Sequence, residues 1–334
     1  MNASLIWEWV IKSVIVLLVL TAGFAYTTLF ERRVIARMQV RVGPNRAGPD
    51  GLLQPIADAF KLIFKEGFIP DKADRVVYVL APLITVIPAM IISAVVPWGP
   101  TVSIFGRTVP LSVADVNTGV LYILTVTSIS VYGITLAGWS SNDKYSMLGG
   151  LRSTSQMISY ELALGLAMLG PVLLSGSMSL TTIVNDQQHL WYVLLQPVAA
   201  IVYAIAAIAE VNRPPFDMPE AEQELTGGYL TEYSSMKFAM FYMAEYIKMI
   251  AISMIGASLF LGGFWGPGVT TYPWLGPIYL FIKVVILLFV FVWIRATLPR
   301  IRYDRLMSLG WKVLFPLGLL NILVTAGVIL LAGG

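Results

Sequence analysis

Residues 209–225 read AEVNRPPFDMPEAEQEL and carry the densest group of charges in an otherwise apolar chain of 334 residues. Five carboxylates and a single cation, Arg213, lie within fifteen of these residues. Three prolines prevent one continuous helix, although a short helix from Glu220 onward would place Glu220 and Glu224 on one face. Carboxylates crowded in this way repel one another and bind protons more readily, which suits a proton path. A solvated acidic loop is the simpler interpretation, but the long apolar segments on both sides argue against it.

The composition is that of a polytopic membrane protein. Hydrophobic residues make up 57% of the chain and charged residues 12%, which is far from the balance of a soluble domain. A hydrocarbon core of about 30 Å requires roughly 20 apolar residues in a helix. We therefore predict an all-α polytopic membrane protein, one integral membrane domain over residues 1–334, with about eight transmembrane helices near 5–30, 76–97, 118–139, 157–175, 190–209, 238–261, 277–298 and 312–332.

Lysine and arginine residues predict the orientation of these helices. They gather after the first, third, fifth and seventh apolar windows, whereas the alternate connections hold only Arg107. Basic loops face the cytoplasm in most membrane proteins. We therefore expect both termini on the non-cytoplasmic side and cytoplasmic loops at about 31–75, 140–156, 210–237 and 299–311.

Two residue types limit the redox chemistry of the chain. Cysteine is absent and His189 is the one histidine. Disulfides, thiolate-bound iron–sulfur clusters and a haem held by two histidines are therefore excluded. We expect no metal site and no electron carrier bound by this chain.

An amphipathic helix is predicted within the first basic loop, over residues 52–66. Its apolar residues recur at steps of three or four, and Gln54, Asp58, Lys61 and Lys65 take the opposite face. Such a helix is too short to span a bilayer. It either lies in the membrane interface or packs as an ordinary surface helix on its own protein.

The charged residues that fall inside predicted spans include Glu161, Glu245, Lys248 and Lys283. Each costs roughly 2.5–3.5 kcal/mol at membrane depth, so together they cost on the order of 10 kcal/mol unless paired or hydrated. Glu245 and Lys248, three residues apart, neutralise each other in one interpretation, and Lys283 reaches the interface by snorkelling in another. Glu161 has no partner nearby in the sequence, which favours a functional role, and the same holds for Glu210.

Several long motifs resemble one known family. The sequence is similar to the H-type (ND-one type) membrane subunit of respiratory complex I, the proton-pumping NADH-quinone oxidoreductase. The similarity rests on ERR at 31–33, QVRVGPN at 39–45, GLLQPIADAFKL at 51–62, EVNRPPFD at 210–217 with EAEQEL at 220–225, EYS at 232–234, AEY at 244–246 and PRIRYD at 299–304.

This resemblance implies a role within a larger enzyme of the bacterial inner membrane. The family's subunit docks a hydrophilic arm, forms much of the chamber in which quinone is reduced, and begins an acidic path toward neighbouring proton-pumping subunits. Quinone is then the substrate, whereas NADH, FMN and the iron–sulfur clusters belong to partner subunits.

The resemblance also implies site residues. Two groups are carried over by position: a proton path of Glu161, Glu210, Asp217, Glu220, Glu222, Glu224 and Glu245, and a quinone-binding set of Arg32, Ala59, Phe60, Arg213, Phe216 and Arg295.

Three alternatives remain open from the sequence. The same architecture serves complexes fed by ferredoxin, reduced deazaflavin or a hydrogenase, and co-purifying subunits would identify the donor. A stand-alone ion-coupled transporter also accounts for intramembrane acids, and solute uptake by the isolated chain would support it. A passive scaffold for a soluble arm predicts that neutralising Glu161 and Glu210 leaves coupling unchanged.

Overall fold

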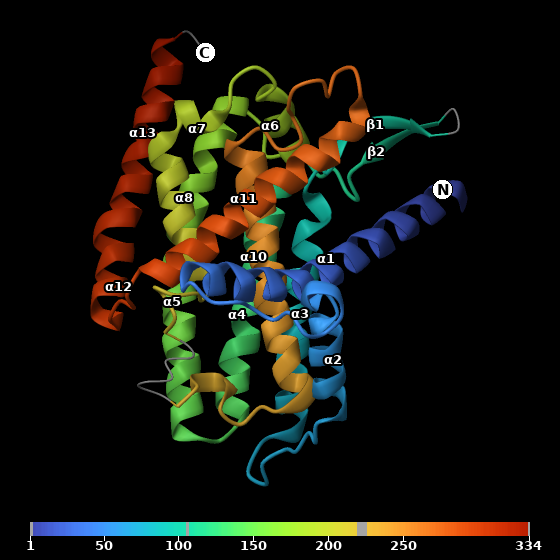
Figure 1. Cartoon of the computed structure of the whole chain (residues 1–334). Helices are drawn as coiled ribbons and strands as arrows, with labels where there is room; N and C mark the ends of the chain where they lie inside the picture. Colours follow the sequence, from blue (N-terminus) through green and yellow to red (C-terminus); the bar gives the residue numbers. More distant parts are fainter. Residues whose placement is uncertain (1–2, 105–106, 219–225, 333–334) are drawn as a thin grey trace.

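The computed structural model describes residues 3–104, 107–218 and 226–332, and these are mainly helical (Figure 1). Its longer elements are α1 (Ala3–Met38), α2 (Gln54–Phe64), α3 (Arg75–Ile91), β1 (Gly99–Ile104), β2 (Arg107–Leu111), α4 (Gly119–Ser140), α5 (Lys144–Ser175), α6 (Leu180–Asp186), α7 (Tyr192–Leu195), α8 (Pro197–Glu210), α10 (Ser235–Phe260), α11 (Gly276–Thr297), α12 (Tyr303–Leu309) and α13 (Phe315–Leu331).

Seven helical stretches in the described parts of the chain are long and apolar enough to cross a membrane. They are Trp7–Met38, Arg75–Val95, Gly119–Ser140, Lys144–Ser175, Ser235–Phe260, Pro273–Thr297 and Tyr303–Leu331. The window expected at 190–209 is divided between α7 and the shorter apolar helix α8. The protein is therefore a multi-pass membrane protein, and an eighth crossing through α8 stays a prediction.

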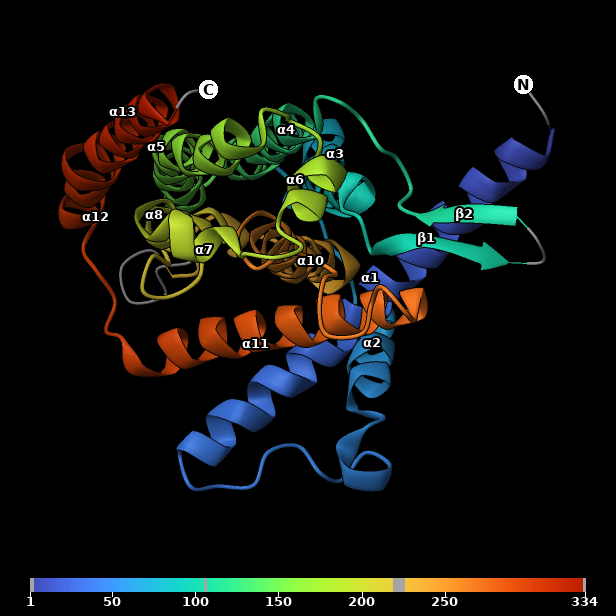
Figure 2. The same cartoon turned by 90° about the horizontal axis from the view of Figure 1, so that it is seen from above.

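The bundle is organised around α10. Seen from above, α10 lies between an arc formed by α3, α4, α5 and α8 and the two strongly tilted helices α1 and α11 (Figure 2). In α10, 67% of the most apolar stretch is buried, compared with 17% for the stretch in α1 and 28% for the one in α11. Charged groups on α10 are consequently enclosed by the protein, while α1 and α11 expose much of their surface.

Small residues allow α4 and α5 to pack closely. A Cβ on Gly138 of α4 would lie 2.5 Å from the Ser146 carbonyl oxygen and 3.2 Å from the Gly150 Cα, so only glycine fits there. Close backbone approach at small residues is a common basis of helix packing in membranes. Asp143 caps α5 by accepting hydrogen bonds from the backbone amides of Tyr145 and Ser146. This packing places Glu161 of α5 against α4.

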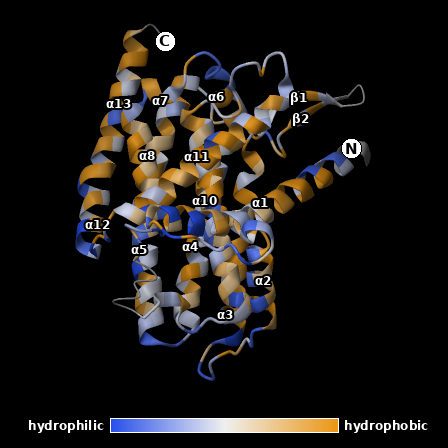
Figure 3. Ribbon diagram, viewed as in Figure 1, coloured by the Kyte–Doolittle hydropathy of each residue, from blue (hydrophilic) through white to orange (hydrophobic). Residues whose placement is uncertain are grey.

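One end of the bundle carries a feature that the all-α prediction lacked. β1 and β2 form an antiparallel hairpin, which lies near α6 at the upper end of the view in Figure 1. The hydropathy colouring shows polar residues at the opposite, lower end of α3 and α5 and along the connection from α1 to α2 (Figure 3). The basic loops thus gather away from the hairpin.

The amphipathic helix predicted at 52–66 is present as α2. Its apolar face is open: Phe60 is 57% and Phe64 81% exposed. The helix is held to α1 by an ion pair between Arg32 and Asp58, Nη1 to Oδ2 2.7 Å. The apolar face therefore does not pack on this chain as an ordinary surface helix would, and placement in the membrane interface remains our prediction.

Candidate functional site

An ion pair in the first half of α10 forms the centre of the site. Arg213, three residues after the end of α8, is 6% exposed, and its Nε lies 2.6 Å from Oε1 of Glu245 on α10. The guanidinium also stacks 4.2 Å above the ring of Tyr246. A charge this deeply buried persists because a carboxylate compensates it.

The same arginine reaches a second acid on another helix. Glu31 of α1 is 4% exposed; its Oε1 lies 3.6 Å from Nη1 of Arg213 and accepts a hydrogen bond from Nη1 of Arg295 on α11. Two arginines and two glutamates from α1, α10, α11 and the segment after α8 therefore form one cluster, which is buried at Glu31 and Arg213 and reaches the surface at Arg295, whose side chain is 35% exposed.

A second buried pair lies one helical turn further along α10. Lys248 Nζ is 2.6 Å from Oε1 of Glu210, which is fully buried, and it donates to Oγ of Ser130 on α4 at 3.1 Å. The expectation that Glu245 and Lys248 neutralise each other is wrong. Both side chains pair across the bundle, because Arg213 and Glu210 approach α10 closely enough to compete with a neighbour on the same helix.

A small cavity separates the two pairs. Its lining includes Glu210, Glu245, Lys248 and Ser130, and its volume is about 30 Å³. A cavity needs about 10–15 Å³ by this measure to hold a water molecule, with two or more polar partners. The space between the pairs is therefore large enough for a water that would connect their hydrogen-bonding groups.

Glu161 extends the polar row on the far side of α4. Its carboxylate accepts hydrogen bonds from the hydroxyls of Ser128 and Thr127, the latter at 3.4 Å. Its described partners are hydroxyls rather than a cation. Ser130 donates to the backbone oxygen of Thr127, one helical turn earlier on α4. Thr127, which contacts Glu161, and Ser130, which contacts Lys248, therefore share one face of this helix.

Lys283 behaves differently from the snorkelling side chain that the sequence suggested. It is 8% exposed, and its Nζ donates to the backbone oxygens of Leu261, Gly263 and Trp265 at 2.6–2.8 Å. The ammonium is satisfied by carbonyls of its own protein, and it anchors the connection between α10 and α11.

The segment that follows α8 is fixed where it leaves the bundle. Nε2 of Gln156 on α5 donates to the carbonyl oxygens of Ala209 and Phe216 at 2.7 and 2.8 Å and to Oδ1 of Asn212 at 3.2 Å. Phe216 is 5% exposed and packs against Tyr160, with ring centroids 5.7 Å apart. This anchoring holds Arg213 in place.

The predicted acids separate into two groups. Glu161, Glu210 and Glu245 belong to the row of polar groups, in which Glu210 is fully buried and Glu161 and Glu245 are partly buried; Asp217 is partly buried as well. Glu220, Glu222 and Glu224, with the short helix expected from Glu220 onward, lie outside the described residues.

The predicted quinone residues also occupy two places. Arg213 and Arg295 belong to the buried cluster, and Phe216 packs in the core beside α5. In contrast, Arg32 faces α2, where Ala59 and Phe60 are exposed.

Sequence reasoning missed three members of the site, namely Glu31, Lys248 in its pairing with Glu210, and Ser130. Glu31 stands at the start of the quoted ERR motif, but nothing local to the sequence shows that it turns inward while Arg32 turns outward.

Comparison with known proteins agrees with this architecture. A family model described as NADH dehydrogenase matches residues 11–326. The chain is 52% identical to the NADH-quinone oxidoreductase H subunit of Thermomicrobium roseum, over 96% of each chain. It is 53% identical to the second H-type NADH-quinone oxidoreductase subunit of Geobacter metallireducens, over 95% of this chain and 94% of the relative. With NADH-quinone oxidoreductase subunit 8 of Thermus thermophilus it shares 52% identity, over 97% of this chain and 88% of the relative.

Proposed function

This chain belongs to the H-type subunit family of NADH-quinone oxidoreductases, and we propose that it forms a wall of the quinone chamber and couples quinone reduction to proton translocation. One observation carries the proposal. A buried row of charges and hydroxyls runs from Arg295 and Glu31, through Arg213 and Glu245, to Lys248, Glu210, Ser130 and Glu161. A passive anchor has no need for so many desolvated charges, because each is costly in a membrane.

The proposed setting is the bacterial inner membrane, with eight crossings and both termini outside. The gathering of Lys and Arg in alternate connections between the spans supports this orientation. The hydrophilic arm with the terminal iron–sulfur cluster would dock on the side that carries these basic connections. Neighbouring membrane subunits would cover the exposed apolar sides, and NADH, FMN and the clusters would stay on the partner subunits.

Quinone enters, in this proposal, beside the junction of α1 and α2. Arg32 holds α2 through Asp58, and Ala59 and Phe60 lie on the same short helix. Since α2 exposes its apolar face, it offers a surface along which a lipid-soluble carrier can approach the membrane boundary. Glu31, the residue next to Arg32, points into the buried cluster, so one turn of α1 faces both the entrance and the charged row.

Reduction of a quinone to a quinol takes up two electrons and two protons, and it transiently places negative charge in a low-dielectric site. Coulomb energies grow as the dielectric constant falls, so the nearest arginines respond most strongly. Nε of Arg213 lies 2.6 Å from Glu245 and Nη1 lies 3.6 Å from Glu31. A shift of the guanidinium toward Glu31 would weaken its contact with Glu245, and Glu245 would then bind a proton more readily.

From Glu245 the proton would move along the row. A water in the 30 Å³ cavity would relay it toward Glu210 and Lys248, and the hydroxyls of α4 would carry it toward Glu161. The acidic segment from Asp217 to Glu224 would serve as the two-state element that responds first to quinone charge.

The proposal is tested with Glu161→Gln and Glu210→Gln in the intact complex, reconstituted in vesicles. We expect quinone reduction and proton pumping to fall together by about tenfold or more, since the path loses a protonatable group. Glu8→Gln is the control, because Glu8 pairs only with Lys12 near the start of α1. Wild-type rates in both path variants would support the passive scaffold instead.

The acidic segment needs a separate test. Glu220→Gln combined with Glu224→Gln should lower both rates if these acids report quinone charge to the row. If both rates stay at the wild-type level while Glu161→Gln lowers them, the buried row is retained and the segment is removed from the mechanism.

A further inference from the structure

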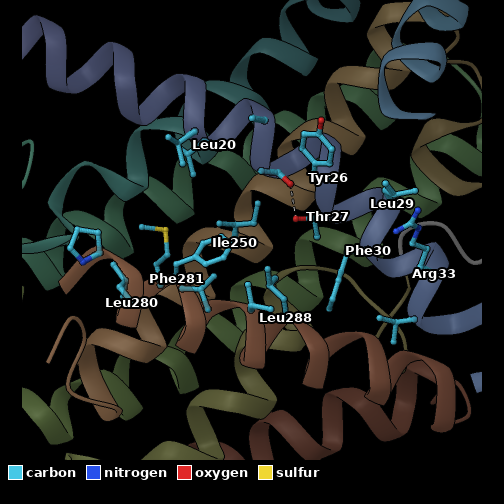
Figure 4. A pocket seen from close by; sticks show the side chains of 18 of the residues that line it. Leu20, Tyr26, Thr27, Leu29, Phe30, Arg33, Ile250, Leu280, Phe281 and Leu288 are labelled. Atoms are coloured by element: carbon cyan, nitrogen blue, oxygen red, sulfur yellow. Dashed lines mark hydrogen bonds between the residues drawn. The ribbon is translucent and has the colours of Figure 1, made fainter. Parts of the chain in front are cut away.

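A cavity outside the proposed site runs along α1 between α10 and α11, with a volume of about 770 Å³ (Figure 4). Leu20 and Leu280 lie toward one end and Arg33 lies at the other. Its floor is closed by Leu20, Leu280 and Leu288, which are 1%, 2% and 6% exposed, while Tyr26 and Phe281 at its edge are 49% and 67% exposed. We call this space the α1–α11 slot; it opens at the exposed edge that Tyr26 and Phe281 form.

The slot is apolar along its length and basic at one end. Arg33 and Arg37, four residues apart on α1, line that end, and no acidic residue contributes to the described lining. Residues at this spacing share a helix face. Within the described ranges neither arginine forms an ion pair. The slot therefore presents two uncompensated guanidinium groups beside a hydrophobic channel.

The slot is long enough to hold an acyl chain. The helix rises about 1.5 Å per residue, so the interval from Leu20 to Arg33 is about 20 Å along the axis. One leaflet of the hydrocarbon core is about 15 Å thick. An acyl chain as long as one leaflet is thick therefore fits within the slot, and its headgroup would lie at the end that Arg33 and Arg37 line.

We propose that the α1–α11 slot binds an anionic glycerophospholipid, with an acyl chain in the channel and the phosphate on Arg33 and Arg37. Guanidinium groups bind phosphate bidentately, and basic pockets between transmembrane helices on the cytoplasmic side suit anionic headgroups. A quinone is neutral and gives these arginines no counter-charge. None of the residues proposed above for quinone binding lines the slot.

A bound lipid would act on the charged row through the two helices that it joins. Phe30 lines the slot directly before Glu31, and Leu288 lies two turns before Arg295 on α11. The lipid would brace the crossing of α1 and α11 and so keep Glu31 and Arg295 paired. Only this consequence rests on the proposed function; the binding site itself does not.

The site is tested by photolabelling in the assembled complex. The probes are phosphatidylglycerol and phosphatidylcholine, each carrying a diazirine in one acyl chain, and labelled peptides are quantified by mass spectrometry per assembled complex. We expect phosphatidylglycerol to label peptides of 19–30 and 280–288 at least about fivefold more than phosphatidylcholine. The reason is that each arginine strengthens the binding of an anionic headgroup by about fivefold. Arg33→Gln with Arg37→Gln should abolish that preference, and Arg41→Gln, a basic residue outside the slot lining, should preserve it.

A second pair of variants tests the channel rather than the charge. Val285→Phe should fill the slot and lower labelling by both probes, whereas Ile286→Phe, whose wild-type side chain is 55% exposed outside the lining, should not. Equal labelling by the two lipids would overturn the proposal. So would displacement of the phosphatidylglycerol label by a short-chain quinone, which would identify a quinone site, or an absence of label on both helices, which would mean that a neighbouring subunit covers the slot.

Discussion

Arg213 and Glu245 form an ion pair in which the side chains are only 7% and 14% exposed, with 2.6 Å between Nε and Oε1. A buried pair of this kind adds little net stability, because desolvation of two charges offsets their attraction. Removing one partner is a different matter, since the other charge is left buried and uncompensated. The pair is therefore better explained by a role in switching than by a role in holding the fold.

The first prediction is a double-mutant cycle on this pair. Glu245→Gln and Arg213→Met alone should each destabilise the assembled complex by up to about 3–5 kcal/mol, because each removes the closer partner of a largely buried charge. The double variant should recover much of that loss and still fail to pump protons. Thermal unfolding of the complex and pumping in vesicles measure the two effects, and coupling is the deviation from additivity.

A surface pair is the control for that cycle. Arg302 and Asp304 lie 3.4 Å apart with side chains 82% and 67% exposed, and exposed pairs contribute about 0–1 kcal/mol. Asp304→Asn should leave stability nearly unchanged. Additive effects of Glu245→Gln and Arg213→Met would show that the two residues act independently, contrary to the proposed switch.

The second prediction concerns the hydroxyl that holds Glu161. Ser128→Ala removes its hydrogen bond and leaves Thr127 at 3.4 Å. Hydrogen bonds to charged groups contribute about 1.5–3 kcal/mol, so pumping should fall by about tenfold if that bond positions the carboxylate. Thr125→Ala on the exposed face of α4, where the hydroxyl bonds only to Leu121, should not change it. Equal pumping in the two variants would remove Ser128 from the path.

The sequence predicted the site's residue types better than their pairing. Intramembrane charges are costly wherever they lie, so Glu161, Glu210, Glu245 and Lys248 were identifiable from hydropathy alone. The pairing of these charged residues depends on how α8 and α10 pack against each other, and a short stretch of sequence does not determine that packing. Spacing suggested Glu245 with Lys248, whereas tertiary contacts pair Lys248 with Glu210.

Helices were predictable where the sequence has a long apolar run or a clear helical repeat of apolar residues. Apolar windows of about 20 residues located the long helices, and the 3–4 residue pattern located α2. The hairpin at 99–111 was missed because its short strands lie in a connection between spans and carry no strong alternation. The inward orientation of Glu31 could not be predicted either, because its neighbour Arg32 belongs to the same charged motif and faces the opposite way.

The third prediction concerns the segment after α8. Gln156→Leu removes the hydrogen bonds that Nε2 donates to Ala209, Asn212 and Phe216, and a hydrogen bond within a protein contributes about 0.5–1.5 kcal/mol. Amide hydrogen exchange in peptides of 209–218 should therefore accelerate at least tenfold in the assembled complex, with pumping reduced because Arg213 is no longer held. Gln188→Leu, at an exposed position, is the matched control. Unchanged exchange would mean that the segment is held by its other contacts, such as the bond from the Ile301 amide to the Pro215 carbonyl oxygen.

The fourth prediction separates quinone access from proton coupling. Asp58→Asn weakens the contact between Asp58 and Arg32, which holds α2 against α1 through a partly exposed ion pair. Such pairs contribute about 0–1 kcal/mol, so the complex should assemble normally and the catalytic constant should change little. The KM for quinone should rise about two- to fivefold, because α2 forms one side of the proposed entrance and its position becomes less defined. Lys61→Gln, one turn further along the polar face of the same helix and not a member of that ion pair, is the comparison. A fall in the catalytic constant at unchanged KM would contradict the assignment, since it would place Arg32 and Asp58 in the coupling row rather than at the entrance.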